Sequence, residues 1–274
     1  MILKDLLSID SLLYEINKDK RDFDFLAGGT DIMPLIHKGL YKKEIIYDMS
    51  PFKEELSFIR EKNTSIEIGC LTTLFSIHSN NVVKQFLPQL SKALKSIGSV
   101  QIQNMATLTG NIANASPAAD SVPVLLVKKA SIKLKSIDGE RTIPLENFYV
   151  DYKKTLKKKN EFIYSIEINK NKLGESSDFI KVGTKKAMAV SKINLSYSIF
   201  EKKVLFASGS IYRYPVRLYN VEKHWFGKNI TKKNWLDILS EDIKPIDDIR
   251  SSSLYRKNVL TNLIYHLYKK TNKE

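Results

Sequence analysis

The chain has 274 residues, a length that favours two packed domains or one large one, and its 43% hydrophobic and 27% charged residues exclude disordered, collagen-like and low-complexity classes. The 44 basic and 30 acidic residues give a formal net charge of +14, but only seven of the basic residues are arginine and no nucleic-acid-binding motif is present, so we expect no nucleic-acid partner. The single cysteine, Cys70, excludes an internal disulfide and cannot alone hold an iron–sulfur cluster or a structural zinc.

The amino terminus shows no targeting signal, because Lys4 and Asp5 interrupt its apolar run. The longest segment without a charged residue, Ser96 to Ala119, contains too many amide and hydroxyl side chains to cross a bilayer. We therefore expect a cytoplasmic protein with no membrane span. The four histidines show no ligand spacing, so we expect no metal site either.

The first elements read as strand, glycine turn, helix and strand. Phe23 to Leu26 alternates as a strand and stops at Ala27-Gly28-Gly29. Thr30 or Asp31 can then cap a short helix that carries Ile32, Leu35 and Ile36, and Ile45 to Met49 is the next predicted strand.

The following 120 residues mix hairpins with helices. The predicted strands are Leu56 to Arg60, Ser65 to Cys70, Ser131 to Ser136, Glu140 to Ile143 and Glu161 to Ile168, and the predicted helices are Val82 to Ile97 and a short one beginning at Asp120. The segment from Lys153 to Lys159 holds five lysines, which are most simply a solvated loop and alternatively a docking patch.

The remaining chain has strands near Phe179 to Val182, Ala189 to Phe200 and Val204 to Tyr212, followed by helices near Val216 to Phe226, Lys232 to Leu239 and Ser253 to Lys269. Strands and helices are mixed without strict alternation, so the predicted fold class is α+β. We place a first domain at residues 1–170, with subdomains of about 1–52 and 53–170, and a second at 171–274.

Two features point to a ligand. In LAGGTD, residues 26–31, two glycines between a strand and a helix let backbone amides approach a phosphate, although a glycine pair is also an ordinary turn. The 24 uncharged residues from Ser96 to Ala119 have the composition of a loop that lines a closed site, or of a buried connection that satisfies its own backbone. Together they suggest a ligand with two ends, such as a dinucleotide. No G-x-G-x-x-G, P-loop or G-x-S-x-G motif is present, which argues against those modes of binding and catalysis.

These segments resemble a known family. AGGTD (27–31) and ATLTGNIANASPAADSVPVLL (106–126) are similar to the paired flavin motifs of the FAD-binding medium subunit of molybdenum hydroxylases, the group that includes xanthine dehydrogenase and carbon monoxide dehydrogenase. The resemblance extends, in the family's order, to IEIGCLTT (66–73), YKKTLKKKNEFIYSIEI (152–168), FIKVGTKKAMAVSKINL (179–195), ASGSIYRYPVRL (207–218) and DDIRSSSLYRKNVL (247–260). It therefore covers nearly the whole chain.

The resemblance implies an FAD-binding half of two α+β subdomains, followed by a C-terminal α+β domain of the flavoprotein-subunit type. It implies that the FAD-contacting residues are Leu26, Ala27, Gly28, Gly29, Thr30, Asp31, Ile32, Met33, Ile97, Thr107, Leu108, Thr109, Gly110, Asn111, Asp120, Ile163 and Lys181. Met188 falls at about the place where relatives put a residue beside the isoalloxazine ring.

Elementary chemistry leaves two readings for several of these residues. Lys181 near the ring would stabilise negative charge on reduced flavin, or it is an exposed strand lysine. Asp120 accepts from a ribose hydroxyl, or it caps the helix that begins there. Met188 is an apolar neighbour of the flavin, or a core methionine.

The chain departs from the family at Thr109. The family's second motif usually reads T-x-G-G-N, whereas Thr107 to Asn111 reads TLTGN. A Cβ at Thr109 would weaken binding unless φ is negative there, although its hydroxyl could donate to a phosphate oxygen.

From the resemblance we expect an FAD-binding electron-transfer subunit, an oxidoreductase with no catalytic residue of its own. Its partners would be an iron–sulfur small subunit and a molybdopterin large subunit, and its electrons would pass to NAD or another acceptor. The alternative is a non-catalytic scaffold of the same fold that has lost FAD.

Overall fold

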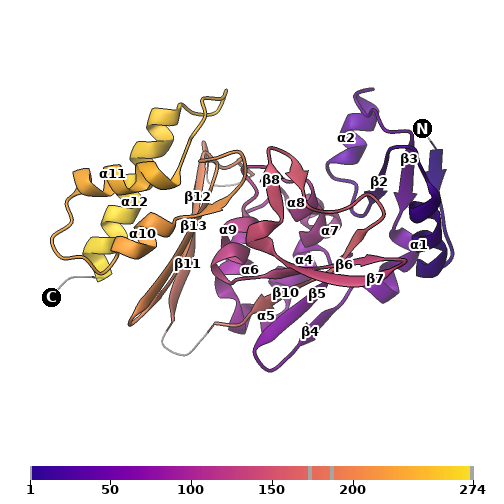
Figure 1. Ribbon diagram of the computed structural model, residues 1–274, viewed down its shortest axis with the longest axis horizontal. Coiled ribbons are helices and arrows are strands. Elements are labelled where there is room, and N and C mark those ends of the chain that lie inside the picture. Colours follow the sequence, from indigo (N-terminus) through magenta and orange to yellow (C-terminus); the bar gives the residue numbers. More distant parts are fainter. Residues whose placement is uncertain (1, 172–174, 186–187, 272–274) are drawn as a thin grey trace.

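The computed structural model describes residues 2–171, 175–185 and 188–271 and arranges them as three larger sheets in a row, each with helices beside it (Figure 1). Helices and strands follow one another without regular alternation, which confirms the predicted α+β class. None of the described helices is both long and apolar enough to span a bilayer.

The N-terminal lobe, residues 2–48, is a parallel sheet of strand order β1-β3-β2 with two helices. Its elements are β1 Ile2–Lys4, α1 Ile9–Lys18, β2 Phe23–Leu26, α2 Ile32–His37 and β3 Ile45–Asp48. Helix α1 was not predicted from the sequence, although its buried face of Ile9, Leu12, Leu13 and Ile16 has helical spacing. The glycine turn follows β2, at the carboxyl edge of the parallel sheet, where open sheets of this kind place their ligands.

The middle lobe, residues 50–169, is an antiparallel sheet of order β4-β5-β10-β6-β7 packed against short helices. Its strands are β4 Ile59–Glu61, β5 Ser65–Gly69, β6 Ser131–Ser136, β7 Gly139–Pro144, β8 Tyr149–Asp151, β9 Lys154–Thr155 and β10 Phe162–Asn169. Its helices are η1 Ser50–Phe52, α3 Lys53–Leu56, α4 Leu74–Ser79, α5 Asn81–Phe86, α6 Pro88–Lys95, α7 Val100–Met105, α8 Leu108–Ala113, α9 Ser121–Val127 and η2 Leu145–Asn147.

Three elements of this lobe differ from the sequence prediction. The helix predicted from Val82 to Ile97 is two helices, α5 and α6, because Pro88 disfavours helical backbone at Leu87, which has φ −138° and ψ 51°. Leu56 ends helix α3 instead of opening a strand. The uncharged segment predicted as a loop contains α7 and α8, whose caps Ser99 and Thr107 accept from backbone amides.

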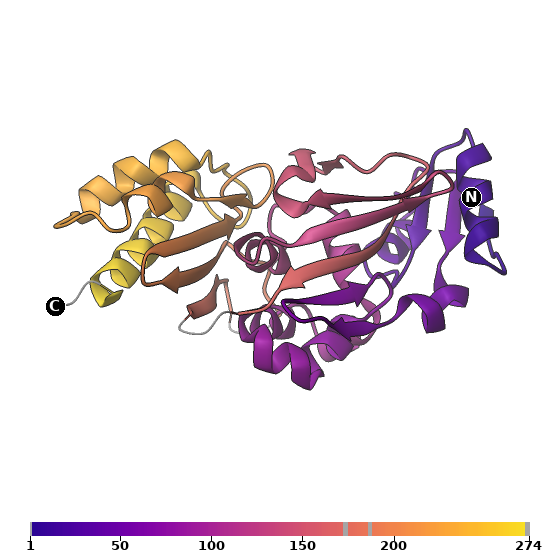
Figure 2. The ribbon, with the colours of Figure 1, turned by 60° about the horizontal axis from the view of Figure 1, so that its bottom comes forward.

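The C-terminal lobe, residues 176–271, is a sheet of order β11-β12-β13-β14 with three helices on its outer side, in orange and yellow in Figure 2. Its elements are β11 Ser176–Val182, β12 Ile193–Phe200, β13 Lys203–Gly209, β14 Val216–Arg217, α10 Tyr219–His224, α11 Lys232–Asp242 and α12 Ser253–Thr271. Successive strand residues face opposite sides: Phe206 packs against the outer helices, whereas Leu205 and Ala207 join the core of the middle lobe.

Two boundaries in this lobe are corrected by the structure. The predicted helix from Val216 starts with the short strand β14, and the predicted strand from Ala189 starts only at Ile193. Of the residues before Ile193, Ala189 and Val190 instead line the cavity described below. The domain division at 52 and 170 falls between the three sheets, and we keep it as a proposal.

Candidate functional site

A cavity of about 830 Å³ lies where the three lobes meet. Its wall includes Gly28 from the N-terminal lobe, Thr109 from the middle lobe and Lys181 from β11 of the C-terminal lobe. This volume falls within the usual range for small-molecule and cofactor sites, so the site can accept a ligand of that class.

The two motifs singled out in the sequence touch one another beside this cavity. A Cβ added at Gly28 would lie 1.9 Å from the carbonyl oxygen of Met105, so only glycine permits this approach of the two backbones. The Asn114 side-chain amide donates to Asp31 Oδ1 at 3.0 Å. Two segments 80 residues apart therefore form one continuous wall.

The structure brings most of the predicted site residues to this wall. Those that line the cavity are Ala27, Gly28, Gly29, Thr30, Asp31, Ile32, Ile97, Thr107, Thr109, Gly110, Asn111, Asp120, Ile163 and Lys181, together with Met188. Three others do not line it. Leu108 is fully buried in the middle core, Leu26 lies in β2 with its carbonyl bonded to Met49, and the Met33 side chain is 38% exposed.

Thr109 fits its position without backbone strain. It lies in the first turn of α8, and the described residues with positive φ do not include it. Its Oγ1 is buried, and no other described residue offers it a hydrogen-bond partner. Thr109 also lines the cavity, so its hydroxyl is a candidate donor to a ligand bound there.

Asp120 and Lys181 form a buried ion pair at the cavity. Lys181 Nζ lies 2.6 Å from Asp120 Oδ2 and also donates to the carbonyl of Ser96. Asp120 Oδ1 accepts from Ser191 Oγ at 2.5 Å and from Asn194 Nδ2 at 2.7 Å. The expectation that the Asp120 side chain caps the following helix is wrong: its carboxylate is taken up by these side chains, and it makes no capping bond to α9.

One part of the wall is cationic. Lys42, Lys43, Lys153 and Lys157 line it, and Lys43 is paired with Asp24 at 2.6 Å. Lys157 Nζ donates to the carbonyls of Lys158 and Glu161, and burial lowers its pKa to about 8. The lysine run is thus not simply a solvated loop, because two of its members face the cavity.

Two further titratable groups at the cavity are shifted by burial. Burial raises the pKa of Asp31, and the nearby Lys153 opposes that rise. Burial raises the pKa of the Cys70 thiol to about 12, which keeps it protonated and unreactive at neutral pH.

Sequence reasoning missed several lining residues. Asn114, Ser116, Ala118 and Ala119 belong to the uncharged segment that had been noted as a unit, so its composition was the available signal. The apolar residues Phe25, Met49, Leu71 and Phe162 also line the cavity, and nothing in a single sequence separates them from ordinary core.

Comparison with known proteins places these features in a family. Residues 8–170 match the family model described as the FAD binding domain in molybdopterin dehydrogenase. The glyceraldehyde dehydrogenase medium chain of Sulfolobus acidocaldarius is 30% identical over 256 residues, which cover 89% of each chain. The nicotinate dehydrogenase FAD-subunit of Eubacterium barkeri is 27% identical and covers 89% of this chain and 86% of its own.

A solved structure shows the same fold. The carbon monoxide dehydrogenase from Hydrogenophaga pseudoflava superposes with a TM-score of 0.89 over 96% of this chain and 94% of that one, at 22% identity. At this level of identity the likeness concerns the fold alone.

Proposed function

The chain belongs to the family of FAD-binding domains of molybdopterin dehydrogenases, and from this premise we propose that it carries electrons out of a molybdenum-containing dehydrogenase complex. FAD is its cofactor, and FAD supplies the redox chemistry by accepting electrons from one donor and releasing them to another. The protein's part is to bind the flavin, orient it and set the charge around it.

We assign the diphosphate of FAD to the wall where the two motifs touch. Gly28 and Gly29 line the cavity at this wall, and the Thr109 hydroxyl there has no acceptor among the described residues. Ile97 and Ile163 offer apolar surface to the rings, and Asp120 can accept from a ribose hydroxyl. Lys181, beside Asp120, is the cation that would favour negative charge on the ring.

The partners follow from the names of the relatives. These are a medium chain and an FAD-subunit, which are parts of larger enzymes. We propose that this chain assembles with an iron–sulfur small subunit and a molybdopterin large subunit, and passes electrons to NAD or to another acceptor.

The meeting of the two motifs at one cavity carries this proposal, because Gly28 admits the Met105 carbonyl and both motifs line the space in which FAD would lie. The test is to purify the chain and measure its visible flavin absorbance, expecting roughly one FAD per chain. Adding the two partner subunits and a substrate should then bleach that absorbance. Colourless protein that takes up no added FAD would instead support the scaffold.

A further inference from the structure

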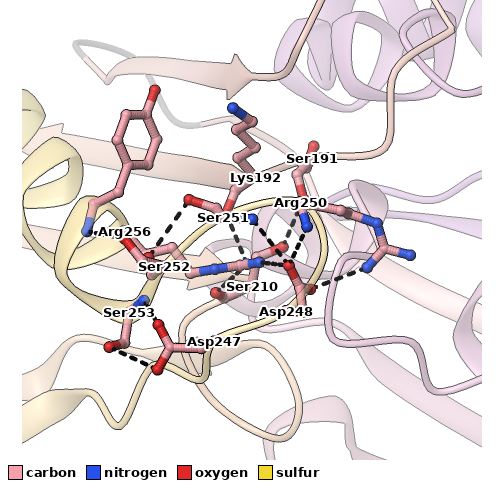
Figure 3. Close-up of polar contacts among 11 residues, drawn as sticks. Ser191, Lys192, Ser210, Asp247, Asp248, Arg250, Ser251, Ser252, Ser253 and Arg256 are labelled. Atoms are coloured by element: carbon pink, nitrogen blue, oxygen red, sulfur yellow. Dashed lines mark hydrogen bonds and ion pairs between the residues drawn. The ribbon is translucent and has the colours of Figure 1, made fainter.

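A buried arginine of the last helix, Arg256, bonds to the segments that carry Lys192, Ser210 and Asp248 (Figure 3). Arg256 of α12 is 2% exposed, and its Nη1 donates to the carbonyls of Lys192 at 2.9 Å and Ser210 at 2.8 Å. Its Nη2 donates to Asp248 Oδ1 at 2.6 Å. One guanidinium therefore holds three chain segments, and the cavity described above does not include it.

The carboxylate that anchors this arginine is itself fixed by its surroundings. Asp248 Oδ1 accepts from the amides of Arg250 at 2.8 Å and Ser251 at 3.1 Å. Burial alone would raise the pKa of Asp248, but these amides and the Arg256 charge lower it, so the carboxylate stays ionised. Neighbouring Asp247 accepts from the amide of Ser253 at the start of α12. The helix end and the arginine are thus held as one unit.

The other side of the arginine leads to the cavity. Ser210, whose carbonyl Arg256 binds, donates through Oγ to the Ser191 carbonyl at 3.1 Å. Ser191 Oγ in turn donates to Asp120 Oδ1, the carboxylate that pairs with Lys181. Every link is between groups no more than 5% exposed, apart from Lys181 at the wall, so water does not compete for these bonds.

The backbone conformation at Ser210 also depends on the bond from Arg256. Ser210 has φ +64°, a left-handed conformation that non-glycine residues adopt only where surrounding contacts hold them. Its amide donates to the Pro117 carbonyl at 2.7 Å, next to the cavity residues Ser116 and Ala118. Without the guanidinium, the carbonyls of Ser210 and Lys192 lose a buried donor, and the segments that hold Asp120 are free to shift.

We propose that Arg256 is a positioning residue for FAD: through Ser210 and Ser191 it fixes the Asp120–Lys181 pair at the cavity wall. The proposal rests on the proposed function, because FAD is the group toward which the pair is positioned. On this proposal, helix α12 influences the charge around the flavin through Arg256, although no atom of Arg256 lines the cavity.

The test replaces Arg256 by methionine and compares it with a matched variant, Arg217→Met. Arg217 is also buried, at 9% exposure, and its ionic partners among the described residues, Glu222 and Glu146, lie outside the cavity lining. For Arg256→Met we expect FAD titrated into apoprotein to bind about 3- to 30-fold more weakly. For Arg217→Met we expect a comparable loss of thermal stability with unchanged affinity.

Two readouts separate positioning from simple destabilisation. At saturating FAD, the visible spectrum and the reduction potential of the bound flavin should shift in Arg256→Met and not in Arg217→Met. In apoprotein, amide hydrogen exchange around Ser191 and Pro117 should quicken only in Arg256→Met. Asp248→Asn, which keeps the guanidinium and weakens its anchor, should shift the same quantities in the same direction by less, and serves if the methionine variant does not fold.

Unchanged affinity, spectrum and potential in a folded Arg256 or Asp248 variant would overturn the proposal, as would equal changes in Arg217→Met. If the wild-type chain binds no FAD, the proposed function fails, whereas the exchange measurement on apoprotein still decides whether Arg256 orders the wall.

Discussion

Thr109 departs from the motif that the resemblance predicts, and its backbone conformation accommodates a side chain. The residue lies in a helical turn with negative φ, so its Cβ adds no backbone strain. Its hydroxyl is buried at the cavity without a partner among the described residues. The threonine thus brings a hydrogen-bond donor to the residues that line the cavity.

Replacing Thr109 by valine should weaken FAD binding about 10- to 100-fold, because valine keeps the shape and removes a hydrogen bond to a charged phosphate. Thr109→Ser, which keeps the hydroxyl, is the control and should bind within about threefold of wild type. Fluorescence titration of apoprotein with FAD measures both. Equal affinity for the valine and serine variants would show that the hydroxyl does not contact the cofactor.

Lys157 should make FAD binding depend on pH. Its pKa of about 8 lies below its usual 10.5 because burial disfavours the charged form, so the folded protein loses this cation as pH rises through 8. A bound anion favours the charged form, and affinity should therefore fall between pH 7 and 9.5 by up to about tenfold, the change that a one-unit rise in pKa produces. In Lys157→Met the profile should be flat over that range. A wild-type profile as flat as that of the variant would place Lys157 away from the phosphates.

The pKa of Lys157 has a matching consequence for stability. Because the folded pKa is below the unfolded one, the penalty for burying the cation is fully present below pH 8 and is relieved as pH rises toward 10.5. Wild-type protein should therefore gain stability between pH 8 and 10.5, whereas Lys157→Met, which lacks the titrating group, should not. The free energy of unfolding of the variant minus that of wild type should fall over that interval, and urea denaturation at several pH values measures it.

Most helices and strands whose apolar residues recur at a regular spacing could be predicted from the sequence. The alternation of Phe162–Asn169 and the apolar stripe of Ser253–Thr271 each reflect burial of one face, and both elements were expected. The helices α7 and α8 were not, because each has only 6 residues and neither carries a charged residue to mark an exposed face. Their ends are decided by capping bonds of Ser99 and Thr107.

The site could be predicted only in part. The two motifs were visible because glycine at a close approach and a long uncharged segment leave a signal in one sequence. The partners of Asp120 were not visible, because Lys181, Ser191 and Asn194 lie 61 to 74 residues further along the chain. Of the two explanations that the sequence offered for Asp120, helix capping proved wrong, and the ribose contact stays a prediction.

The middle sheet carries a buried carboxylate whose stabilising effect depends on pH. Glu67 of β5 accepts from Ser165 Oγ at 2.7 Å and from Lys133 Nζ at 3.1 Å. Burial alone would raise its pKa, but these bonds outweigh it and lower the pKa from 4.5 to about 2. The contribution of the Glu67 carboxylate to the free energy of unfolding is therefore complete above pH 4.5 and is lost as the pH falls toward 2.

Glu67→Gln should lower the free energy of unfolding at pH 7 by about 1–3 kcal/mol, because it leaves Lys133 without its charge partner. The difference from wild type should narrow as pH falls below 4.5. Glu61→Gln, which removes an ion pair of an exposed strand carboxylate with Lys170, is the control and should cost about 0–1 kcal/mol. Urea denaturation at pH 7 and pH 3 measures both, and a pH-independent difference at Glu67 would contradict the assignment.

At the scale of the whole molecule, the cavity depends on contact between lobes. A Cβ at Gly28 would overlap the Met105 carbonyl, so Gly28→Ala should push the N-terminal lobe away from α7 and both destabilise the protein and weaken FAD binding. Gly139→Ala is the control: its φ of +120° makes any side chain costly, but it is the first residue of β7 and an added Cβ would meet no atom within 4 Å. It should lower the melting temperature without changing FAD affinity. Parallel losses of affinity in the two variants would attribute the Gly28 effect to instability alone.

FAD should in turn hold the three lobes together, because the wall of its cavity draws residues from each of them. Free FAD at 100 times its Kd should raise the free energy of unfolding by about 2.7 kcal/mol, and riboflavin, which lacks the diphosphate that both motifs are proposed to bind, should give much less. Hydrogen exchange on adding FAD should slow together at Gly28, Thr109 and Lys181, one position in each lobe. Protection confined to a single lobe would mean that the ligand occupies only part of the cavity and that the lobes are held by their own contacts.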